Sequence, residues 1–450
     1  MKRGIFALTT ALAVLALAGA GFGQTVTITC RCVADGVNSQ MVQWIRDYVI
    51  PEFEAAKGGD VSVELTEFGG TDEAMKEQYA LDLSVGGGAD VLAFDGFWVP
   101  EFVAAGLLEP LSAVGGQQAE DWEGWGHIPD GLEELLSYEG ERYGIALGTD
   151  YRMFFYRKDM LEQAGVENAD DWQPQSWEDV LDAARKVKQT NNNASPLQIN
   201  AGTAMGEATT MQGYFPMLLG TGHFLQDDQG RWIVRSQGIL DTLELYKTIY
   251  VDEQLGDSRL QLTQDGRNRT FANFRDGNTA ILLEGDYFYR GPTAPDAEFE
   301  VANRDEVMGW AAIPAMEPGA GFRGQDFVTI SGGTGFVVNP KSANRELAWE
   351  LLAFMNSQES LAVAQETQPR IRVRDDVPVP DNAFLTNTAA ELGPFTTARP
   401  NDPDYPQISY EAQLMTERVV SGEMTPEEAM EAYARAVTDI VGADNVVDLN

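Results

Sequence analysis

An acidic side chain and two aromatic rings follow a short apolar run of the sequence. Residues 89–94 come after three glycines and form a segment typical of a strand buried on both faces. Asp95, Phe97 and Trp98 follow at once, before a helical pattern whose first turn can hold a proline. A carboxylate accepts hydrogen bonds from hydroxyl groups, and aromatic rings stack on apolar C–H faces. These residues predict a site for a polyhydroxylated ligand; the alternative is that Asp95 caps a helix and both rings belong to the core.

The same pattern recurs later in the chain: a strand ends in a polar or glycine-rich break, and an aromatic side chain lies nearby. It recurs at Asp150-Tyr151, at Gly285-Asp286-Tyr287 and at Gly333-Thr334. In open α/β sheets, ligands bind at the carboxyl ends of the strands. The four segments together predict a binding cleft between two lobes.

No catalytic motif accompanies these residues. The sequence has no nucleophile elbow, phosphate-binding loop, zinc-binding helix motif or dinucleotide fingerprint. Its two histidines, His127 and His223, supply little acid–base or metal chemistry. A pair of carboxylates would be enough for a glycosidase, but spacing singles out none of the many acids. We expect a binding protein with no catalytic residues, no metal and no cofactor, and we keep a secreted glycoside hydrolase as an alternative.

Alternating strand and helix patterns must position the candidate residues. Before the run at 89–94 the patterns predict a strand at 26–32, a helix at 41–53, a strand at 61–68 and a helix at 72–85. Such alternation predicts an α/β fold with a parallel sheet and right-handed crossovers.

Two further segments are predicted to contain breaks. Residues 143–147 and 151–156 are predicted as short strands separated by a break at 148–150, where the chain would cross into a second lobe. A glycine-rich turn at 332–335 is predicted to precede a strand at 336–339.

Composition limits the class of partner. A chain of 450 residues with 44% apolar content is long enough for two domains with real cores. Its formal net charge of −39 argues against nucleic acid or an anionic membrane surface as partner, because both are bound by basic patches.

The N-terminus has the pattern of a secretory signal peptide. Lys2 and Arg3 precede an apolar core at residues 5–18, and small residues follow before Gln24. We expect residues 1–23 to be removed and the mature chain to lie in the periplasm or cell envelope. The sequence has no other stretch long and apolar enough to cross a membrane.

Cys30 and Cys32 are the only cysteines. At positions i and i+2 of a predicted strand they point to the same face, and we expect two buried free thiols. A strained disulfide is the first alternative, because export permits oxidation. A metal site that also uses the histidines is a weaker alternative.

Seven segments, in this order, resemble the family 1 extracellular solute-binding proteins of ABC importers, in particular the maltose-, trehalose- and α-glucoside-binding group. They are GGGADVLAFDGFWVPEFVAAGLLEPL, YGIALGTDYRMFFYRKDMLEQAGV, SWEDVLDAARKV, FRDGNTAILLEGDY, SGGTGFVVNPKSANRELAWELLAFM, ARPNDPDYPQIS and SGEMTPEEAM. The resemblance covers almost all of the mature chain.

The resemblance implies a two-lobed, periplasmic-binding-protein-like fold of type II, with two mostly parallel sheets flanked by helices and three hinge crossings. It places lobe one at 24–148 and 331–373, and lobe two at 149–330 and 374–450. It also implies a monomer that closes on a sugar by hinge motion and delivers it to the permease subunits of an ABC transporter.

The family's site residues match several positions of this sequence. The matching positions are Asp95, Phe97, Trp98, Asp150, Tyr151, Gly285, Asp286, Tyr287, Gly333, Thr334, Arg370 and Tyr405, with Arg31 and Asp35 added by topology alone. Residues 202–214 contain no tryptophan, which favours a mono- or disaccharide over a long maltodextrin. Arg31 and Arg370 support an alternative ligand that is anionic, such as a sugar phosphate or an organic acid.

Overall fold

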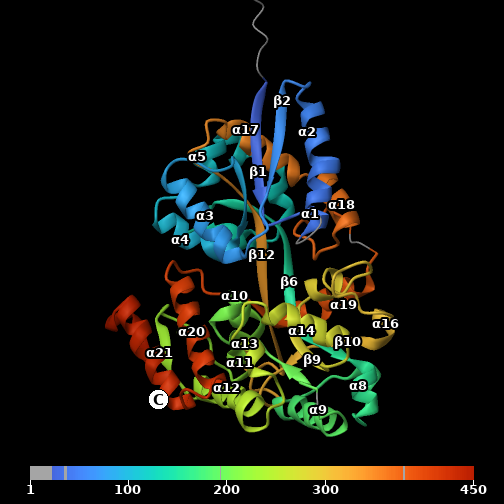
Figure 1. Ribbon diagram of the computed structural model, residues 1–450. Helices are drawn as coiled ribbons and strands as arrows, with labels where there is room; N and C mark the ends of the chain where they lie inside the picture. The colour runs from blue at the N-terminus through green and yellow to red at the C-terminus, as the bar shows by residue number, and fades with distance from the viewer. Residues whose placement is uncertain (1–22, 35–37, 193, 379–380, 450) are drawn as a thin grey trace, which may run out of the picture.

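The computed structural model describes residues 23–34, 38–192, 194–378 and 381–449. The protein has two lobes connected by long strands (Figure 1). Residues 1–22 of the predicted signal peptide, and the candidate Asp35, lie outside the described residues. Among the helices that are described, none is long and apolar enough to cross a membrane.

Lobe one, the upper lobe in Figure 1, is the predicted α/β unit. Strand β1 (Gln24–Cys30) pairs in parallel with β2 (Val61–Glu67) and with β3 (Val91–Asp95), which confirms the predicted parallel pairing. Its other elements are α1 (Ser39–Trp44), α2 (Ile50–Ala56), α3 (Asp72–Ser84), α4 (Val99–Ala104), α5 (Leu111–Gly115), α6 (Gln117–Glu120), α7 (Asp130–Glu133), β4 (Ser137–Tyr138), β5 (Glu141–Arg142), α17 (Arg345–Met355) and α18 (Gln358–Thr367).

The helix predicted at 41–53 runs from residue 39 to residue 56 with one wide turn inside it. A π-helical turn, Ile45–Val49, joins α1 to α2. The wide turn directly precedes Pro51, which has no N–H to donate and would clash with a carbonyl one turn earlier in a regular helix.

Lobe two packs most of its helices around short strands. Its elements are α8 (Lys158–Gln163), α9 (Trp177–Thr190), β7 (Leu197–Gln198), α10 (Glu207–Thr209), α11 (Phe215–Gly220), β8 (Trp232–Arg235), α12 (Gln237–Lys247), α13 (Ser258–Gln261), α14 (Gly266–Arg275), β9 (Ile281–Gly285), α15 (Tyr287–Arg290), α16 (Arg304–Val307), β10 (Met308–Ala311), β11 (Ile313–Pro314), α19 (Ala383–Leu392), β13 (Thr396–Thr397), α20 (Tyr405–Val420), α21 (Pro426–Val441) and β14 (Val446–Asp448). Helix α9 begins after Ser176, whose hydroxyl accepts the Asp179 amide at 3.2 Å and caps the first turn.

Two long strands pass from one lobe to the other (Figure 1). They are β6 (Gly144–Arg157) and β12 (Phe327–Val338), which pair antiparallel with each other. The break predicted at 148–150 and the turn predicted at 332–335 are therefore both wrong. Each glycine-rich segment is held extended by the other, since Gly332, Gly333 and Thr334 pair with Asp150, Thr149 and Gly148.

The two long strands also join the sheets of the lobes. On the side of lobe one, β12 pairs with β3; on the side of lobe two, β6 pairs with β9, and one ten-stranded sheet results. A third connection follows α18 and runs beside β6, where the Thr149 amide donates to the Ile371 carbonyl at 3.4 Å.

Separate hydrophobic cores lie on the two sides of the crossing strands. The core of lobe one takes buried residues from Val26 to Leu147 and from Phe336 to Val377. Two cores of lobe two take residues between Met153 and Ile330 and between Phe384 and Val437. Each lobe therefore has an interior of its own, and the polar residues near the crossing strands lie between these interiors.

Candidate binding site at the lobe junction

Strand register brings several predicted site residues into neighbouring positions. Thr334 of β12 pairs with Asp95 of β3 on one side and with Gly148 of β6 on the other. Four residues farther along β6, Arg152 pairs with Gly285 of β9. Segments distant in the sequence thus meet at one level of the sheet, where the chain passes between the lobes.

One cluster of side chains connects the two lobes directly. Arg399, which follows β13, donates to Asp95 of lobe one at 2.8 Å and forms an ion pair with Glu207 of lobe two at 3.2 Å. The Glu207 carboxylate also accepts from the hydroxyls of Tyr405 and Ser409, each at 2.6 Å. We call Asp95, Glu207 and Arg399 the bridging cluster.

Aromatic rings line the bridging cluster. The Arg399 guanidinium lies 4.1 Å from the centre of the Phe97 ring, and the Phe97 and Tyr405 rings pack edge to face with centroids 5.8 Å apart. Phe97 is partly buried, whereas Tyr405 is fully buried in the core of lobe two. Tyr405 therefore positions Glu207 through its hydroxyl, and Phe97 is the ring that keeps exposed surface.

Trp98 does not share this position. It is 2% exposed and packs edge-on against Phe94, with ring centroids 5.2 Å apart, inside the core of lobe one. The Asp95 carboxylate caps the short 3₁₀ turn Gly96–Trp98, in which the Phe97 and Trp98 rings meet edge to face with centroids 5.9 Å apart. The structure thus assigns Trp98 the packing role that the sequence left open as the alternative.

The carboxylates of the bridging cluster hold their protons more tightly than free acids. Burial raises the pKa of Asp95, and the Arg399 guanidinium opposes that rise. Burial likewise raises the pKa of Glu207 against the effect of Arg399, Ser409 and Tyr405. Burial thus disfavours the ionised form of both acids, and the one guanidinium of Arg399 offsets this effect only in part.

A second group of charges lies on and beside the crossing strands. The Asp150 carboxylate pairs with Arg152 on the same strand and accepts the Gly332 amide of β12 at 3.0 Å. Burial would raise the pKa of Asp150, but Arg152 and the Gly332 amide hold it below its ordinary value. We call Asp150, Arg152, Asp286, Arg290 and Arg370 the hinge cluster.

Asp286 is the most enclosed acid of the hinge cluster. It is 0% exposed, and its nearest charged contact is Arg290 at 3.5 Å. Burial raises its pKa to about 6, with Arg290 opposing the rise and Asp150 adding to it. Its backbone amide donates to the Tyr151 carbonyl at 3.0 Å, which ties the start of α15 to β6.

Tyr287 points toward a buried ion pair. Its hydroxyl donates to Glu284 and accepts from Arg267, each at 2.8 Å, and it also contacts Gln212. A Cβ on Gly285 would lie 2.3 Å from this ring, so only glycine leaves room for it. Gly285 therefore positions Tyr287, and Tyr287 is partly buried at the junction.

Arg370 and Thr334 meet where the third connection leaves α18. The guanidinium lies 3.5 Å from the Thr334 hydroxyl and donates to Gln368 at 2.8 Å. Thr334 is exposed. Its neighbour Gly333 lies against Leu135, and a Cβ added to Gly333 would lie only 2.4 Å from Leu135 Cδ1. Gly333 thus makes room for a neighbouring side chain within the sheet.

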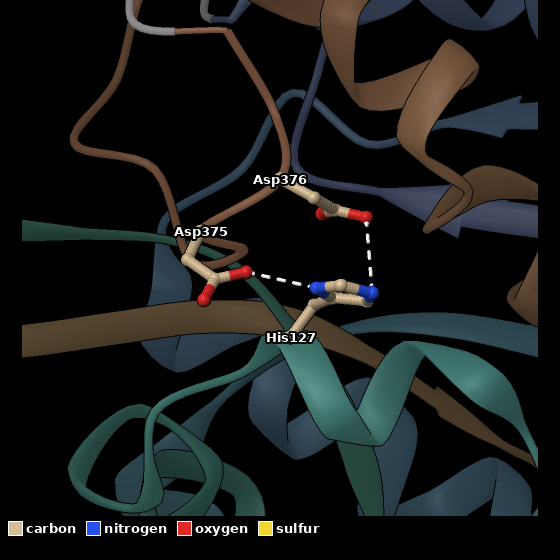
Figure 2. Close-up of side chains that lie close together, drawn as sticks. All are labelled: His127, Asp375 and Asp376. Carbon is tan, nitrogen blue, oxygen red and sulfur yellow. Dashed lines mark hydrogen bonds and ion pairs between the residues drawn. The ribbon is translucent and has the colours of Figure 1, made fainter.

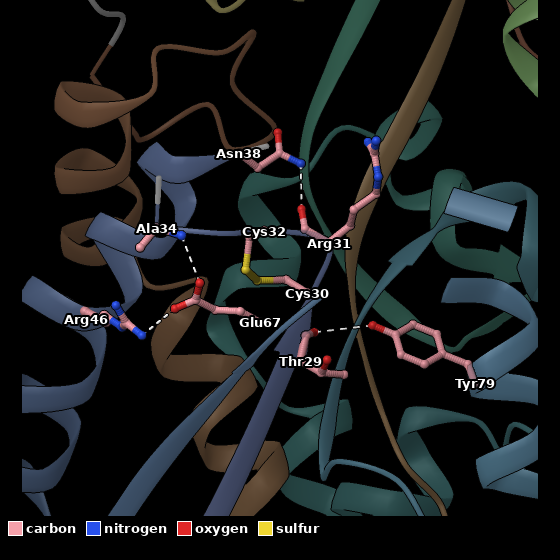
Figure 3. The surroundings of a disulfide bond; sticks show 9 residues. All are labelled: Thr29, Cys30, Arg31, Cys32, Ala34, Asn38, Arg46, Glu67 and Tyr79. Carbon is pink, nitrogen blue, oxygen red and sulfur yellow. Dashed lines mark hydrogen bonds and ion pairs between the residues drawn. A yellow bond between two sulfur atoms is a disulfide. The ribbon is translucent and has the colours of Figure 1, made fainter. Parts of the chain in front are cut away.

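Arg31 lies on the lobe-one side of the junction, next to a disulfide (Figure 3). It donates to the Gly70 carbonyl at 2.8 Å and pairs with Asp72 at 3.3 Å. Cys30 and Cys32 are bonded to each other and fully buried, so the expectation of two free thiols is wrong. Same-face neighbours reach each other because β1 ends at Cys30 and the chain bends at Arg31.

A histidine and two acids lie together outside the junction (Figure 2). His127 contacts Asp375 at 2.9 Å and Asp376 at 3.6 Å, and ligand atoms of the three residues lie within 4.8 Å of one another. Arg374 already holds both oxygens of Asp376, at 2.9 Å and 2.7 Å. We interpret the group as a network of polar contacts that ties lobe one to the third connection.

Several residues of the junction carried no strong signal in the sequence. Glu207 begins the short helix α10, Arg267 lies in helix α14 and Arg399 lies in an irregular segment, and none directly follows a predicted strand. The segment ARPNDPDYPQIS, which contains Arg399, was one of the matched family segments and was the one available signal.

Comparison with known proteins agrees with the architecture. The model of one protein family, described as bacterial extracellular solute-binding protein, matches residues 38–362. A putative binding protein of Brucella abortus is 25% identical over 334 residues, which are 73% of this chain and 72% of that one. The galactooligosaccharide-binding protein of Bacillus subtilis is 22% identical over 364 residues, 80% of this chain and 78% of that one.

Solved structures are similar over nearly the whole length. An ABC transporter solute-binding protein of Thermotoga lettingae, bound with α-D-tagatose, is 27% identical with a TM-score of 0.75, covering 93% of this chain and 100% of that one. The maltose-bound MalE3 of T. maritima is 18% identical with a TM-score of 0.76 over 93% and 100% of the two chains. The similarity to MalE3 shows that this chain has the same two-lobed fold.

Proposed function

This chain belongs to the bacterial extracellular solute-binding protein family, and from that premise we propose that it captures a mono- or disaccharide between its lobes for an ABC importer. The closed molecule would present the sugar to the permease subunits in the membrane. The proteins of this family bind their solutes, and we propose that this one likewise leaves its ligand unchanged.

The bridging cluster is the observation that carries this proposal. Arg399 contacts Asp95 of one lobe and Glu207 of the other, so a ligand held there touches both lobes. Carboxylates and a guanidinium bind hydroxyl groups, while the exposed part of Phe97 suits the apolar face of a sugar ring. Such a mixture is what a carbohydrate needs and what a purely apolar solute does not.

The relatives support a sugar as ligand. Curated relatives are named for binding galactooligosaccharide, arabinooligosaccharide and lactose, and the solved relative at 27% identity carries α-D-tagatose. We propose Asp95, Phe97, Asp150, Tyr151, Asp286, Tyr287, Thr334, Arg370 and Arg31 as the surroundings of the ligand, with Glu207 and Arg399 added. Gly285, Gly333 and Tyr405 support these residues from behind.

The domain boundaries and the cellular location belong to the same proposal. We place lobe one at residues 24–148 and 331–373 and lobe two at 149–330 and 374–450, since the cores divide the chain near these points. Residues 1–23 would direct export, and the mature protein would act as a monomer in the periplasm or cell envelope.

Thermal unfolding against a panel of neutral and acidic mono- and disaccharides tests the proposal. A ligand in 100-fold excess over its dissociation constant should stabilise the protein by about 2.7 kcal/mol. The bound sugar, recovered after long incubation and weighed by mass spectrometry, should be intact. Failure of every sugar to shift the unfolding temperature would contradict carbohydrate capture, and a shortened sugar would show a hydrolase.

A further inference from the structure

The junction is rich in arginine although the protein is strongly acidic. The whole chain has 31 basic residues against 70 acidic ones. At the junction, most arginines form an ion pair with an aspartate or a glutamate. The pairs are Arg31–Asp72, Arg152–Asp150, Arg267–Glu284, Arg290–Asp286 and Arg399 with both Asp95 and Glu207.

Arg370 is the exception among the described residues of the junction. Its side-chain contacts are the Thr334 hydroxyl and the Gln368 amide oxygen, and no carboxylate of the described chain forms an ion pair with it. Gly148 leaves room for its stem, since an added Cβ would lie 3.0 Å from Arg370 Cδ. A planar guanidinium with free donors is suited to hold a carboxylate through two parallel hydrogen bonds.

The surroundings of Arg370 add positive charge. Burial and then the nearby Arg290 lower the pKa of Arg370, and Asp286 and Asp150 oppose that change only in part. The side chains of Arg152 and Arg290 are more than nine-tenths buried. The Nε atom of each is buried too and has no hydrogen-bond partner among the described residues. The hinge cluster therefore has three guanidiniums against two acids.

We propose that Arg370 binds a carboxylate of the ligand, so that the captured sugar is a sugar acid of the uronate class. This inference rests on the proposed function and narrows it to one chemical class. The carboxylate would lie beside Arg370 on the side of the exposed Thr334, and the hydroxyl groups of the same sugar would face the bridging cluster, because Thr334 pairs with Asp95. The ligand would thereby supply the acid that Arg370 lacks.

A single negative charge fits this position better than two. Asp150 and Asp286 influence the pKa of Arg370, so both acids lie close enough to repel an anion placed on it. One unpaired guanidinium balances a carboxylate but leaves a phosphate dianion with excess charge next to these acids. Arg31 offers no equal alternative, since Asp72 and the Gly70 carbonyl already occupy it.

Calorimetric titration with matched probes tests the inference. The probes are D-galacturonate and D-glucuronate, their neutral parents D-galactose and D-glucose, and α-D-glucose 1-phosphate for the dianion. At least one uronate should bind about 10- to 100-fold more tightly than its neutral parent, which is the range for a hydrogen-bonded charge pair. The phosphate should bind more weakly than the uronate.

Two variants separate a direct contact from a structural effect. Arg370→Gln should remove most of the preference for the uronate and change the affinity for the neutral parent much less. Arg269→Gln breaks an exposed pair on α14, where the Arg269 side chain is 65% exposed, and should leave the preference unchanged. Unfolding curves of both variants check that they are folded.

The remaining outcomes each decide the matter. Neutral sugars that bind as tightly as the acids, a phosphate that binds most tightly, or an Arg370→Gln variant that weakens both classes equally would overturn the inference and leave carbohydrate capture standing. Failure of these probes and of the whole sugar panel would overturn the proposed function together with the inference.

Discussion

The hinge cluster and the bridging cluster are built from the same residue types but are held in place differently. Asp150 and Arg152 lie on one crossing strand, and the Gly332 amide that Asp150 accepts lies on the other. Asp95 and Glu207 belong to different lobes and share only Arg399. The Asp150–Arg152 pair of the hinge cluster is thus fixed by the sheet, whereas the bridging cluster exists only while the lobes are together.

This difference separates two roles. A pair fixed within the sheet persists when the lobes open, so breaking it leaves a charge without a partner in every state of the folded protein. A pair that spans the lobes can separate and let water hydrate both partners. The hinge cluster should therefore govern stability, and the bridging cluster should govern the balance between open and closed forms.

The largest effect should follow from removing Asp150. Asp150→Ala leaves Arg152, whose side chain is 7% exposed, without its carboxylate and should lower the free energy of unfolding by about 3–5 kcal/mol. Urea unfolding followed by tryptophan fluorescence measures this change. Asp265→Ala, which breaks an exposed pair with Arg269, is the control and should cost less than about 1 kcal/mol. Equal losses in the two variants would remove the distinction between the clusters.

Asp286 should make the hinge cluster sensitive to pH. Because burial raises its pKa from 3.8 to about 6, the folded protein retains a proton that the unfolded chain releases. The resulting stabilisation is complete below about pH 4 and disappears as the pH rises through 6. Relative to Asp286→Asn, the wild type should lose about 2–3 kcal/mol of unfolding free energy between pH 4 and pH 7.

Urea unfolding of both proteins at several pH values provides the measurement. The subtraction cancels the acids elsewhere in the chain, which titrate in both proteins alike. If the difference in unfolding free energy between the two proteins stays constant with pH, Asp286 is ionised throughout. That result would mean that the charge of Arg290 fully compensates the effect of burial on Asp286.

The sequence predicted the local elements of the lobes well, and the reason is visible in their patterns. The strand predicted at 61–68 and the helix predicted at 72–85 both begin at the predicted residue and end one residue early, because apolar spacing is a local property. The crossing strands were missed for the opposite reason. Glycines at 148 and 332–335 are typical of turns, and only pairing between β6 and β12 keeps them extended.

The site was predictable only where a strand leads into it. Asp95, Asp150 and Asp286 each follow or belong to a strand and lie at the junction. Trp98 was proposed as a ligand contact together with Phe97, but the Trp98 ring is buried in the core of lobe one whereas Phe97 is only partly buried. Arg399 and Glu207 are paired across 192 residues of sequence, and such a contact follows from the closure of the lobes, which no local pattern encodes.

The bridging cluster should show a smaller effect of a different kind. Arg399→Met removes both inter-lobe ion pairs but keeps a side chain of similar length over the Phe97 ring. Because Asp95 and Glu207 can then separate and hydrate, the free energy of unfolding should fall by only about 1 kcal/mol. The ligand-free protein should instead become more open, with a larger radius of gyration by small-angle X-ray scattering. Arg399→Lys keeps the charge and should restore part of the compactness; a compact Arg399→Met protein as unstable as Asp150→Ala would place Arg399 among the structural charges.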